Sequence, residues 1–256
     1  MEFDDSPEFD CPYLNAARSG EVSEYLPMSV LLDQSEEDAA LDGRMHAVAV
    51  FTPDELEAAL SAPNVYLIAL AADDLQVTAV APNGAGVLAT GGVQKLYVSA
   101  GEVYVSDGVQ ITASGSARVH AYDRAHVTLL GTAHAYAFDD VEVTAVHHAT
   151  VRACGKARVT ADKSASVIAF ENAHVTAVGS GVHVRADGQV WVDAHSTARV
   201  AANGTATVVG HSETVKIWAA PGVTVEGSSP ALRMDDTGLH WKQLMALWEQ
   251  WSLTGR

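Results

Sequence analysis

Small apolar and polar residues alternate along most of this chain in units of eight residues. From Ala117 the sequence reads ARVHAYDR, AHVTLLGT, AHAYAFDD, VEVTAVHH, ATVRACGK, ARVTADKS, ASVIAFEN and AHVTAVGS. The first, third and fifth positions are mostly Ala or Val, whereas the second and fourth are mostly polar. On a β-strand this alternation places one set of side chains inward and the other outward. The last three positions hold Gly, Asp, Asn, His and Ser, which are typical of turns.

A longer period of 16 residues lies over the units of eight. Threonine recurs at that spacing at five positions, which are Thr112, Thr128, Thr144, Thr160 and Thr176. We therefore expect an all-β parallel β-solenoid, of the β-helix or β-roll kind, with two strands and two corners in each 16-residue coil. Equivalent residues should stack about 4.8 Å apart in columns. The pattern covers roughly residues 103–217, with a one-residue insertion near Ser180.

The inward positions predict a solid interior. Almost all are Ala or Val, for example Ala149, Val151 and Ala153. Such small side chains let two sheets approach closely and leave no internal cavity. A ligand would therefore bind an outer face, a corner or an end of the solenoid.

The segment HAVAVFTPDELEAALSAPNVYLIAL predicts a strand, a helix and a second strand before the first coil. Thr52 is suited to cap the helix, Pro53 to its first position and Glu55 to a capping box, while Leu56, Ala59 and Leu60 would form the apolar face. The segment resembles the entry of right-handed parallel β-helix proteins, in which a T-P-x-E-L-x-x-A-L helix precedes the coils. The resemblance implies an α/β cap on the solenoid, although the coils here are shorter than those of familiar members.

The C-terminal sequence DDTGLHWKQLMALWEQWSLTGR predicts an amphipathic helix. Its Trp241, Trp248 and Trp251 would make a docking surface or dimer interface, or would cover the last coil near Ile217. We expect four parts, which are a loosely structured acidic arm (1–45), an entry cap with irregular first coils (46–100), the regular solenoid (101–220) and a C-terminal helical cap (221–256).

Negative charge is concentrated in the first quarter of the chain. Residues 1–60 contain 15 acidic and 2 basic residues and so carry −13 of the net charge of −17. This arm is expected to be a solubilising tail, or else to dock on a basic partner or imitate nucleic acid. There is no apolar signal peptide, no apolar stretch long enough to span a bilayer, and only Cys11 and Cys154. A cytoplasmic protein without membrane contact is expected.

The sequence offers little chemistry. His195 and His211 have the spacing of adjacent corners and could share an ion, but a third ligand is not evident, so no metal or cofactor is expected. Candidate acids for sugar cleavage are Asp139, Asp140, Asp162 and Glu171, all explained equally well as turn residues. The chain contains no G-x-S-x-G, phosphate-loop or H-E-x-x-H motif, and no catalytic residue is assigned.

The favoured function is a non-enzymatic protein-binding or scaffold solenoid that presents a rigid outer face and possesses no direct nucleic-acid-binding surface. The candidate contact strip is the corner column Tyr122, Phe138 and Phe170, which packing under the turns would explain equally well. Self-association through the C-terminal helix or a solenoid end is a second expectation. Three alternatives stay open, which are an inhibitor that mimics DNA with its acidic arm, a carbohydrate-active β-helix enzyme, and an ice-binding protein. The last is disfavoured because the column beside the threonines contains charged residues such as Glu142 and Arg158.

Overall fold

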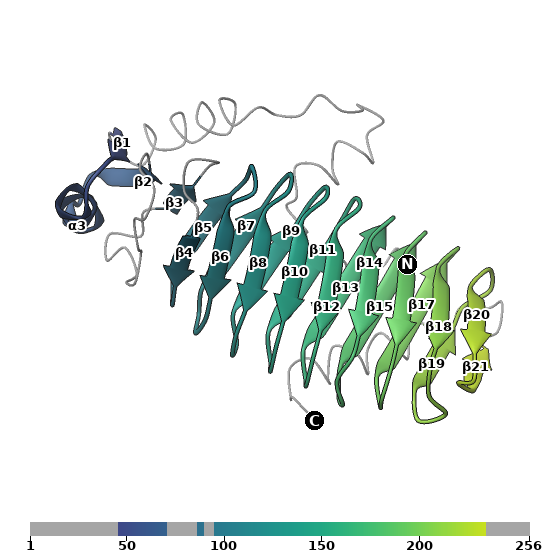
Figure 1. Cartoon of the computed structure of the whole chain (residues 1–256). Coiled ribbons are helices and arrows are strands. Elements are labelled where there is room, and N and C mark those ends of the chain that lie inside the picture. Colours follow the sequence, from purple (N-terminus) through teal and green to yellow (C-terminus); the bar gives the residue numbers. More distant parts are fainter. Residues whose placement is uncertain (1–45, 71–85, 90–94, 234–256) are drawn as a thin grey trace, which may run out of the picture. The chain divides into compact units, whose positions relative to one another are not determined.

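A computed structural model describes residues 46–70, 86–89 and 95–233, which form a parallel β-solenoid with two sheets (Figure 1). The chain passes from one sheet to the other and back in each coil, so that the strands of each sheet stack along the solenoid. The short-coil solenoid predicted from the sequence is therefore confirmed.

The larger sheet, called sheet A, contains 12 parallel strands. In spatial order they are β1 (His46–Val50), β2 (Val65–Leu70), β3 (Gly86–Ala89), β5 (Glu102–Val105), β7 (Arg118–Ala121), β9 (His134–Ala137), β11 (Thr150–Ala153), β13 (Ser166–Glu171), β15 (His183–Gly188), β17 (Arg199–Gly204), β19 (Lys216–Ala219) and β21 (Ala231–Arg233).

The smaller sheet, called sheet B, contains nine strands. They are β4 (Lys95–Val98), β6 (Gln110–Ala113), β8 (His126–Leu129), β10 (Glu142–Ala145), β12 (Arg158–Ala161), β14 (His174–Ala177), β16 (Trp191–Ala194), β18 (Thr207–Gly210) and β20 (Thr224–Gly227). Most strands of the coils have only four residues, which is why the sequence pattern repeats so quickly.

The strands pair in the register that the 16-residue period predicts. Val143 lies between Val127 and Val159 in sheet B, each 16 positions away. The predicted insertion near Ser180 is also present, because Ser166 pairs with His183 rather than with the residue before it. A second insertion, which the sequence analysis did not identify, follows β18, so that Thr207 pairs with Thr224.

The interior is filled by small apolar side chains, as predicted. Val119, Val151 and Val167 in sheet A are 0 % exposed, and the facing Ala145 and Ala161 in sheet B are also 0 % exposed. These residues belong to one continuous apolar cluster that extends from the cap to Val223. Burial of this surface is the main favourable term for folding, and it leaves the outward columns free to vary.

The entry cap forms as the sequence indicates. Helix α3 (Pro53–Ser61) has a capping box, in which the Glu55 amide donates to Thr52 Oγ1 (3.3 Å) and the Thr52 amide donates to the Glu55 carboxylate (3.2 Å). Leu56 and Ala59 are buried, and the helix contacts β1 and β2. Sheet A begins three strands before sheet B, and the helix packs on two of these three strands. The strand, helix and second strand predicted for the cap are therefore confirmed.

The corners of both kinds contain a residue in the left-handed conformation. We call the turn after a sheet A strand corner 1 and the turn after a sheet B strand corner 2. The second residue has a positive φ at corner 1, as in Asp123 (57°), Asp139 (59°) and Gly155 (70°), and also at corner 2, as in Gly131 (69°) and Lys163 (56°). Asn, Asp and Gly tolerate this left-handed conformation best, which explains their recurrence there. A Cβ on Gly155 would lie 3.0 Å from the Asp139 amide nitrogen, a tight contact that a larger residue could adopt only if the neighbouring turn shifted by a few tenths of an ångström.

Both sheets continue past Ile217 through β20 and β21 to Arg233. The acidic arm and the predicted C-terminal helix lie in residues 1–45 and 234–256, outside the described residues. In the described part of the chain, no helix is both long enough and apolar enough to cross a membrane.

Candidate functional site

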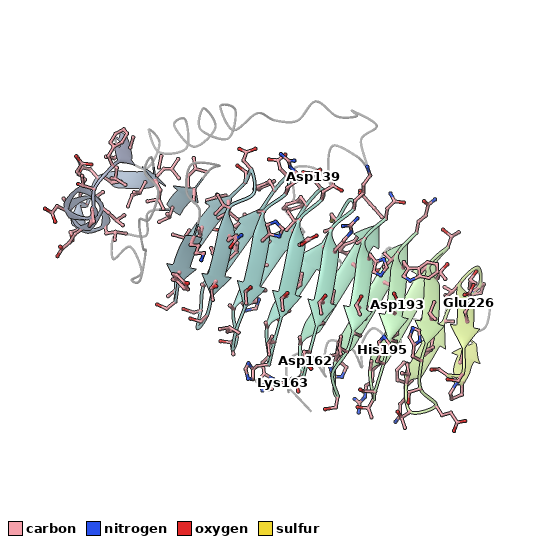
Figure 2. All side chains as sticks on the ribbon, viewed as in Figure 1. Asp139, Asp162, Lys163, Asp193, His195 and Glu226 are labelled. Atoms are coloured by element: carbon pink, nitrogen blue, oxygen red, sulfur yellow. The ribbon has the colours of Figure 1, made fainter. Side chains whose placement is uncertain are left out.

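The outer face of sheet B carries two columns of side chains, one from the first and one from the third residue of each strand. The first column is Lys95, Gln110, His126, Glu142, Arg158, His174, Trp191, Thr207 and Thr224. The third-residue column is Tyr97, Thr112, Thr128, Thr144, Thr160, Thr176, Asp193, Val209 and Glu226. Figure 2 shows the side chains of both sheets projecting outward, with Asp193 and Glu226 labelled.

The threonine column forms as predicted and is half-buried to exposed along its length. Thr128, Thr144 and Thr160 pair in register, and the last two are exposed. The neighbouring Glu142 and Arg158 are exposed as well, so the face is flat but mixed in chemistry. The threonines therefore share their surface with long charged side chains, which is the feature that disfavours ice binding.

A carboxylate lies between an imidazole and a guanidinium in the middle of the first column. The Glu142 carboxylate lies 3.1 Å from His126 Nδ1 and 3.7 Å from Arg158 Nη1. All three side chains are at least half exposed, so each pair adds at most about 1 kcal/mol to the free energy of unfolding. Their main effect is to hold these side chains in fixed positions on the surface.

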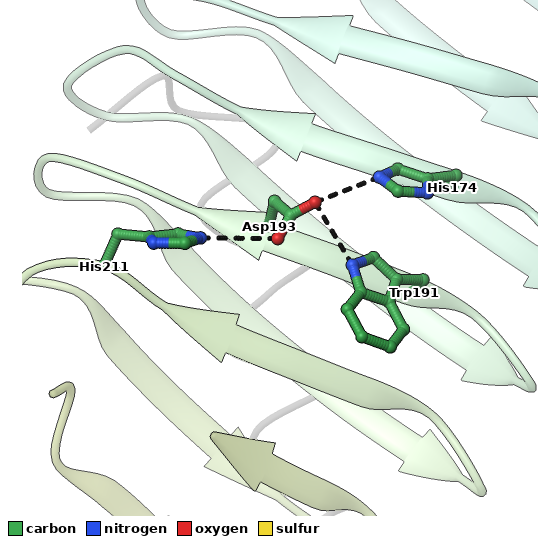
Figure 3. Close-up of polar contacts among 4 residues, drawn as sticks. All are labelled: His174, Trp191, Asp193 and His211. Atoms are coloured by element: carbon green, nitrogen blue, oxygen red, sulfur yellow. Dashed lines mark hydrogen bonds and ion pairs between the residues drawn. The ribbon is translucent and has the colours of Figure 1, made fainter. Parts of the chain in front are cut away.

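A more elaborate cluster lies further along the sheet, around Asp193 (Figure 3). His174 Nε2 lies 3.0 Å from Asp193 Oδ2, and Trp191 Nε1 donates to the same oxygen at 3.1 Å. His211 Nε2 lies 3.3 Å from the other oxygen, Oδ1, on the opposite side of the carboxylate. One carboxylate thus joins β14, β16 and the corner after β18.

These contacts decide the charge of Asp193. Burial alone would raise its pKa, but the hydrogen bonds with His211, Trp191 and His174 outweigh burial and lower the pKa below the ordinary value. Asp193 is therefore ionised at neutral pH. The carboxylate supplies a fixed negative charge between two imidazoles and an indole.

His195 and His211 stack with parallel rings, at a centroid distance of 4.2 Å and an interplanar angle of 4°. The sequence analysis placed them in adjacent corners, and that placement is confirmed. His211 directs Nε2 toward Asp193, and the described residues contain no group of three or more metal-ligating side chains arranged to hold an ion. The geometry therefore favours ring stacking over metal binding by this pair.

The outer face of sheet A has a different character. Tyr104, His120 and Tyr136 occupy one column and stack at 4.8 Å between successive ring centroids, and the Arg152 guanidinium lies 5.8 Å from the Tyr136 ring centroid. All four are half-buried. Burial, followed by the nearby Glu102 carboxylate, raises the pKa of Tyr104 to about 12. This face is a packed aromatic ladder.

Sheet A is also the basic face. Between β5 and β19 its outward positions contain Arg118, Arg152, Arg185, Arg199 and Lys216 but only two acids, Glu102 and Asp187, and Arg185 Nε donates to Asp187 Oδ2 at 2.7 Å. Burial and then the neighbouring guanidinium groups lower the pKa of His134 and His183. The near-balanced charge of the repeats is therefore divided between different faces.

Corner 1 holds the predicted contact strip and a column of acids. Tyr122 and Phe138 stack at 5.1 Å, and Phe138 is 8 % exposed, while Tyr122 and Phe170 are half-buried. Phe138 therefore presents little surface, and a contact role for the strip stays a prediction. Burial and then the neighbouring Asp107 and Asp139 carboxylates raise the pKa of Asp123.

The predicted acids are only partly brought together. Asp139 and Asp140 lie at corner 1 and Glu171 at the end of β13 on the same edge, where burial and then the Asp140 and Glu171 carboxylates raise the pKa of Asp139. Asp162 lies at corner 2, on the opposite edge of the solenoid (Figure 2). A strand of four residues, about 13 Å long, separates the two corners. This distance is greater than the spacing between the two catalytic carboxylates of a glycosidase. Trp241, Trp248 and Trp251 lie outside the described residues.

The Asp193 cluster was missed by sequence reasoning. His174 is 19 positions from Asp193, which is one coil lengthened to 17 residues plus two positions for the change of column. His211 is 18 positions from Asp193, which is one 16-residue coil plus two positions from the column into the corner. The sequence did contain one signal for this cluster. Asp193 replaces threonine in the threonine column, and Trp191 is in the neighbouring column of the same strand. Comparisons with protein-family models, with curated proteins and with solved structures found no match to this chain.

Proposed function

We propose that this protein is a non-enzymatic binding or scaffold solenoid that presents the outer face of sheet B to a protein partner. The observation that carries the proposal is the contrast between a filled interior and this face. Inward residues such as Val143 and Ala145 are at most 2 % exposed, whereas the outward Glu142 and Thr144 beside them are exposed. Recognition must therefore use the outside of the coils.

Sheet B suits recognition because its side chains are held in register. Stacked strands fix the spacing along the columns at about 4.8 Å, so a partner meets a surface with little freedom to lose on binding. The alternation of His126, Glu142 and Arg158 supplies a charge pattern that selects among partners.

The size of the face limits the partner. Nine strands span about 38 Å and four residues span about 13 Å, which gives an area of roughly 500 Å². A stable interface buries about 800 Å² on each partner, so the partner must also contact a corner. Corner 2 provides apolar surface at Val178, which is 46 % exposed, next to sheet B.

Charge reversal across the central pair tests this proposal. Glu142→Lys combined with Arg158→Glu retains an ion pair on the sheet but inverts the field that a partner meets. We expect the variant to unfold at the wild-type temperature and to lose the protein that co-purifies with the full chain from its native host, identified by mass spectrometry and light scattering.

The matched control is Arg118→Glu on the outer face of sheet A, which should retain the partner. A monomer that carries no bound protein under native conditions would contradict the proposal. So would a partner that the Arg118 variant loses and the double variant retains.

A further inference from the structure

Trp191 is an exposed indole on a polar surface. Its relative exposure is 39 %, and among the described residues only Phe51, Tyr97 and Val178 are comparably exposed large apolar residues. A single exposed apolar side chain is ordinary on a protein surface, so the case for a ligand depends on how the ring is held and on what surrounds it. On sheet B, Trp191 shares this degree of exposure with Tyr97 alone, at the other end of the sheet.

The indole is held in one orientation before any ligand arrives. Its Nε1 donates to Asp193 Oδ2 at 3.1 Å, and His174 Nε2 lies 3.0 Å from the same oxygen. The His174 and Trp191 rings are 6.3 Å apart and inclined at 31°, so they do not stack closely on each other. A fixed ring loses little side-chain entropy when a flat ligand face lies against it.

Hydrogen-bonding groups surround the indole. Thr207 follows Trp191 in its column, and Thr176 pairs with Asp193 in the next column. The imidazoles of His174 and His211 are 45 % and 43 % exposed, and Asp193 is 25 % exposed. The surroundings of Trp191 are thus hydroxyl, imidazole and carboxylate groups, which can both donate and accept hydrogen bonds.

This combination matches the chemistry of a sugar ring. A pyranose has an apolar face of C–H groups, which packs on an aromatic ring, and a rim of hydroxyl groups, which need both donors and acceptors. A linear polysaccharide is narrow and needs only a narrow contact surface. The outer face of sheet B provides one, because its strands of four residues are only about 13 Å long.

We propose that Trp191, with Asp193, His174 and Thr207 around it, binds a neutral sugar ring of a polysaccharide. The indole stacks on the face of the ring, and the carboxylate, imidazole and hydroxyl groups bond its hydroxyls. A neutral sugar is specified because the fixed negative charge of Asp193 repels the carboxylate of an acidic sugar. This site goes beyond the proposed protein-binding function, and either can fail without the other.

Affinity electrophoresis of the full chain in native gels tests the site. The gels contain a β-glucan, a galactan or a mannan as neutral probes and polygalacturonate as an acidic probe. We expect at least one neutral polysaccharide to retard the protein. Trp191→Ala should weaken that interaction at least about tenfold, as judged from the polysaccharide concentration that gives half-maximal retardation.

The matched control is Tyr97→Ala, which removes the other exposed aromatic ring of sheet B and should leave retardation unchanged. Equal thermal unfolding of both variants and the wild type shows that the coils are intact. The proposal is overturned if no neutral polysaccharide retards the protein, if only polygalacturonate does, or if both variants behave alike. Loss of a co-purifying protein in Trp191→Ala without any polysaccharide effect would assign Trp191 to the protein interface instead.

Discussion

The two outer faces of the solenoid are built on the same interior but differ in chemistry. Sheet A stacks Tyr104, His120 and Tyr136 in a half-buried ladder and concentrates arginine and lysine. Sheet B stacks threonines beside alternating charges, and its residues are more exposed. Since both faces satisfy the same backbone ladders, stability does not dictate this difference. This contrast is why we propose sheet B, rather than the more closely packed outer face of sheet A, as the face that is presented to ligands.

The largest expected effect comes from the interior that both faces share. Ala145→Phe in sheet B and Ala153→Phe in sheet A each insert a large ring where the native side chain is 0 % exposed. Overpacking of this size should lower the free energy of unfolding by about 3 kcal/mol or more. Thermal or urea unfolding would measure the change for both variants.

Thr144→Phe is the control, because it places the same ring one residue away on the outside of β10. It should change the free energy of unfolding by less than about 0.5 kcal/mol. Comparable losses in the free energy of unfolding for Thr144→Phe and Ala145→Phe would mean that the inward and outward sides of β10 do not differ in burial.

A smaller effect is expected at Asp193, where sheet B departs from its simple columns. Asp193→Asn should lower the free energy of unfolding by about 1 kcal/mol at neutral pH, because a charged acceptor of three hydrogen bonds is lost. The pKa of Asp193 is depressed in the folded state, so its contribution is present above the ordinary carboxyl pKa of about 4 and is lost as the pH falls through the lower, folded-state value.

Urea unfolding between neutral pH and pH 3 would follow this dependence. The stability difference between wild type and Asp193→Asn should shrink as the solution becomes acidic. A difference that is constant over this range would show that the carboxylate charge is not what holds the cluster.

The smallest effect is the difference in stability cost between single substitutions on the two faces. His120→Ala interrupts the aromatic ladder of sheet A and removes its 2.8 Å contact with Glu102, so it should cost about 1 kcal/mol. Thr128→Ala at the equivalent column of sheet B should cost only a few tenths of a kcal/mol. Equal costs, measured by unfolding at neutral pH, would remove the distinction between a packing face and a presenting face.

The repeat made most of the fold predictable, while the candidate site depended on irregularities. Alternation of Val143 and Thr144 fixes which side faces inward, and the 16-residue period fixes which residues stack. The capping box at Thr52 and Glu55 is a local motif, so it too could be identified from the sequence. The contact between His174 and Asp193 could not, because it joins different columns across an insertion.

Cysteine labelling along β10 tests the central claim, a dry interior with function confined to the outer faces. In a chain with Cys11 and Cys154 replaced by Ala, single cysteines are placed at Glu142, Val143, Thr144 and Ala145 and treated with a maleimide under native conditions. The cysteines at Glu142 and Thr144 should react rapidly, and those at Val143 and Ala145 should be protected until the protein unfolds. Rapid reaction at Val143 and Ala145 would show an open or differently wound interior and would contradict the account.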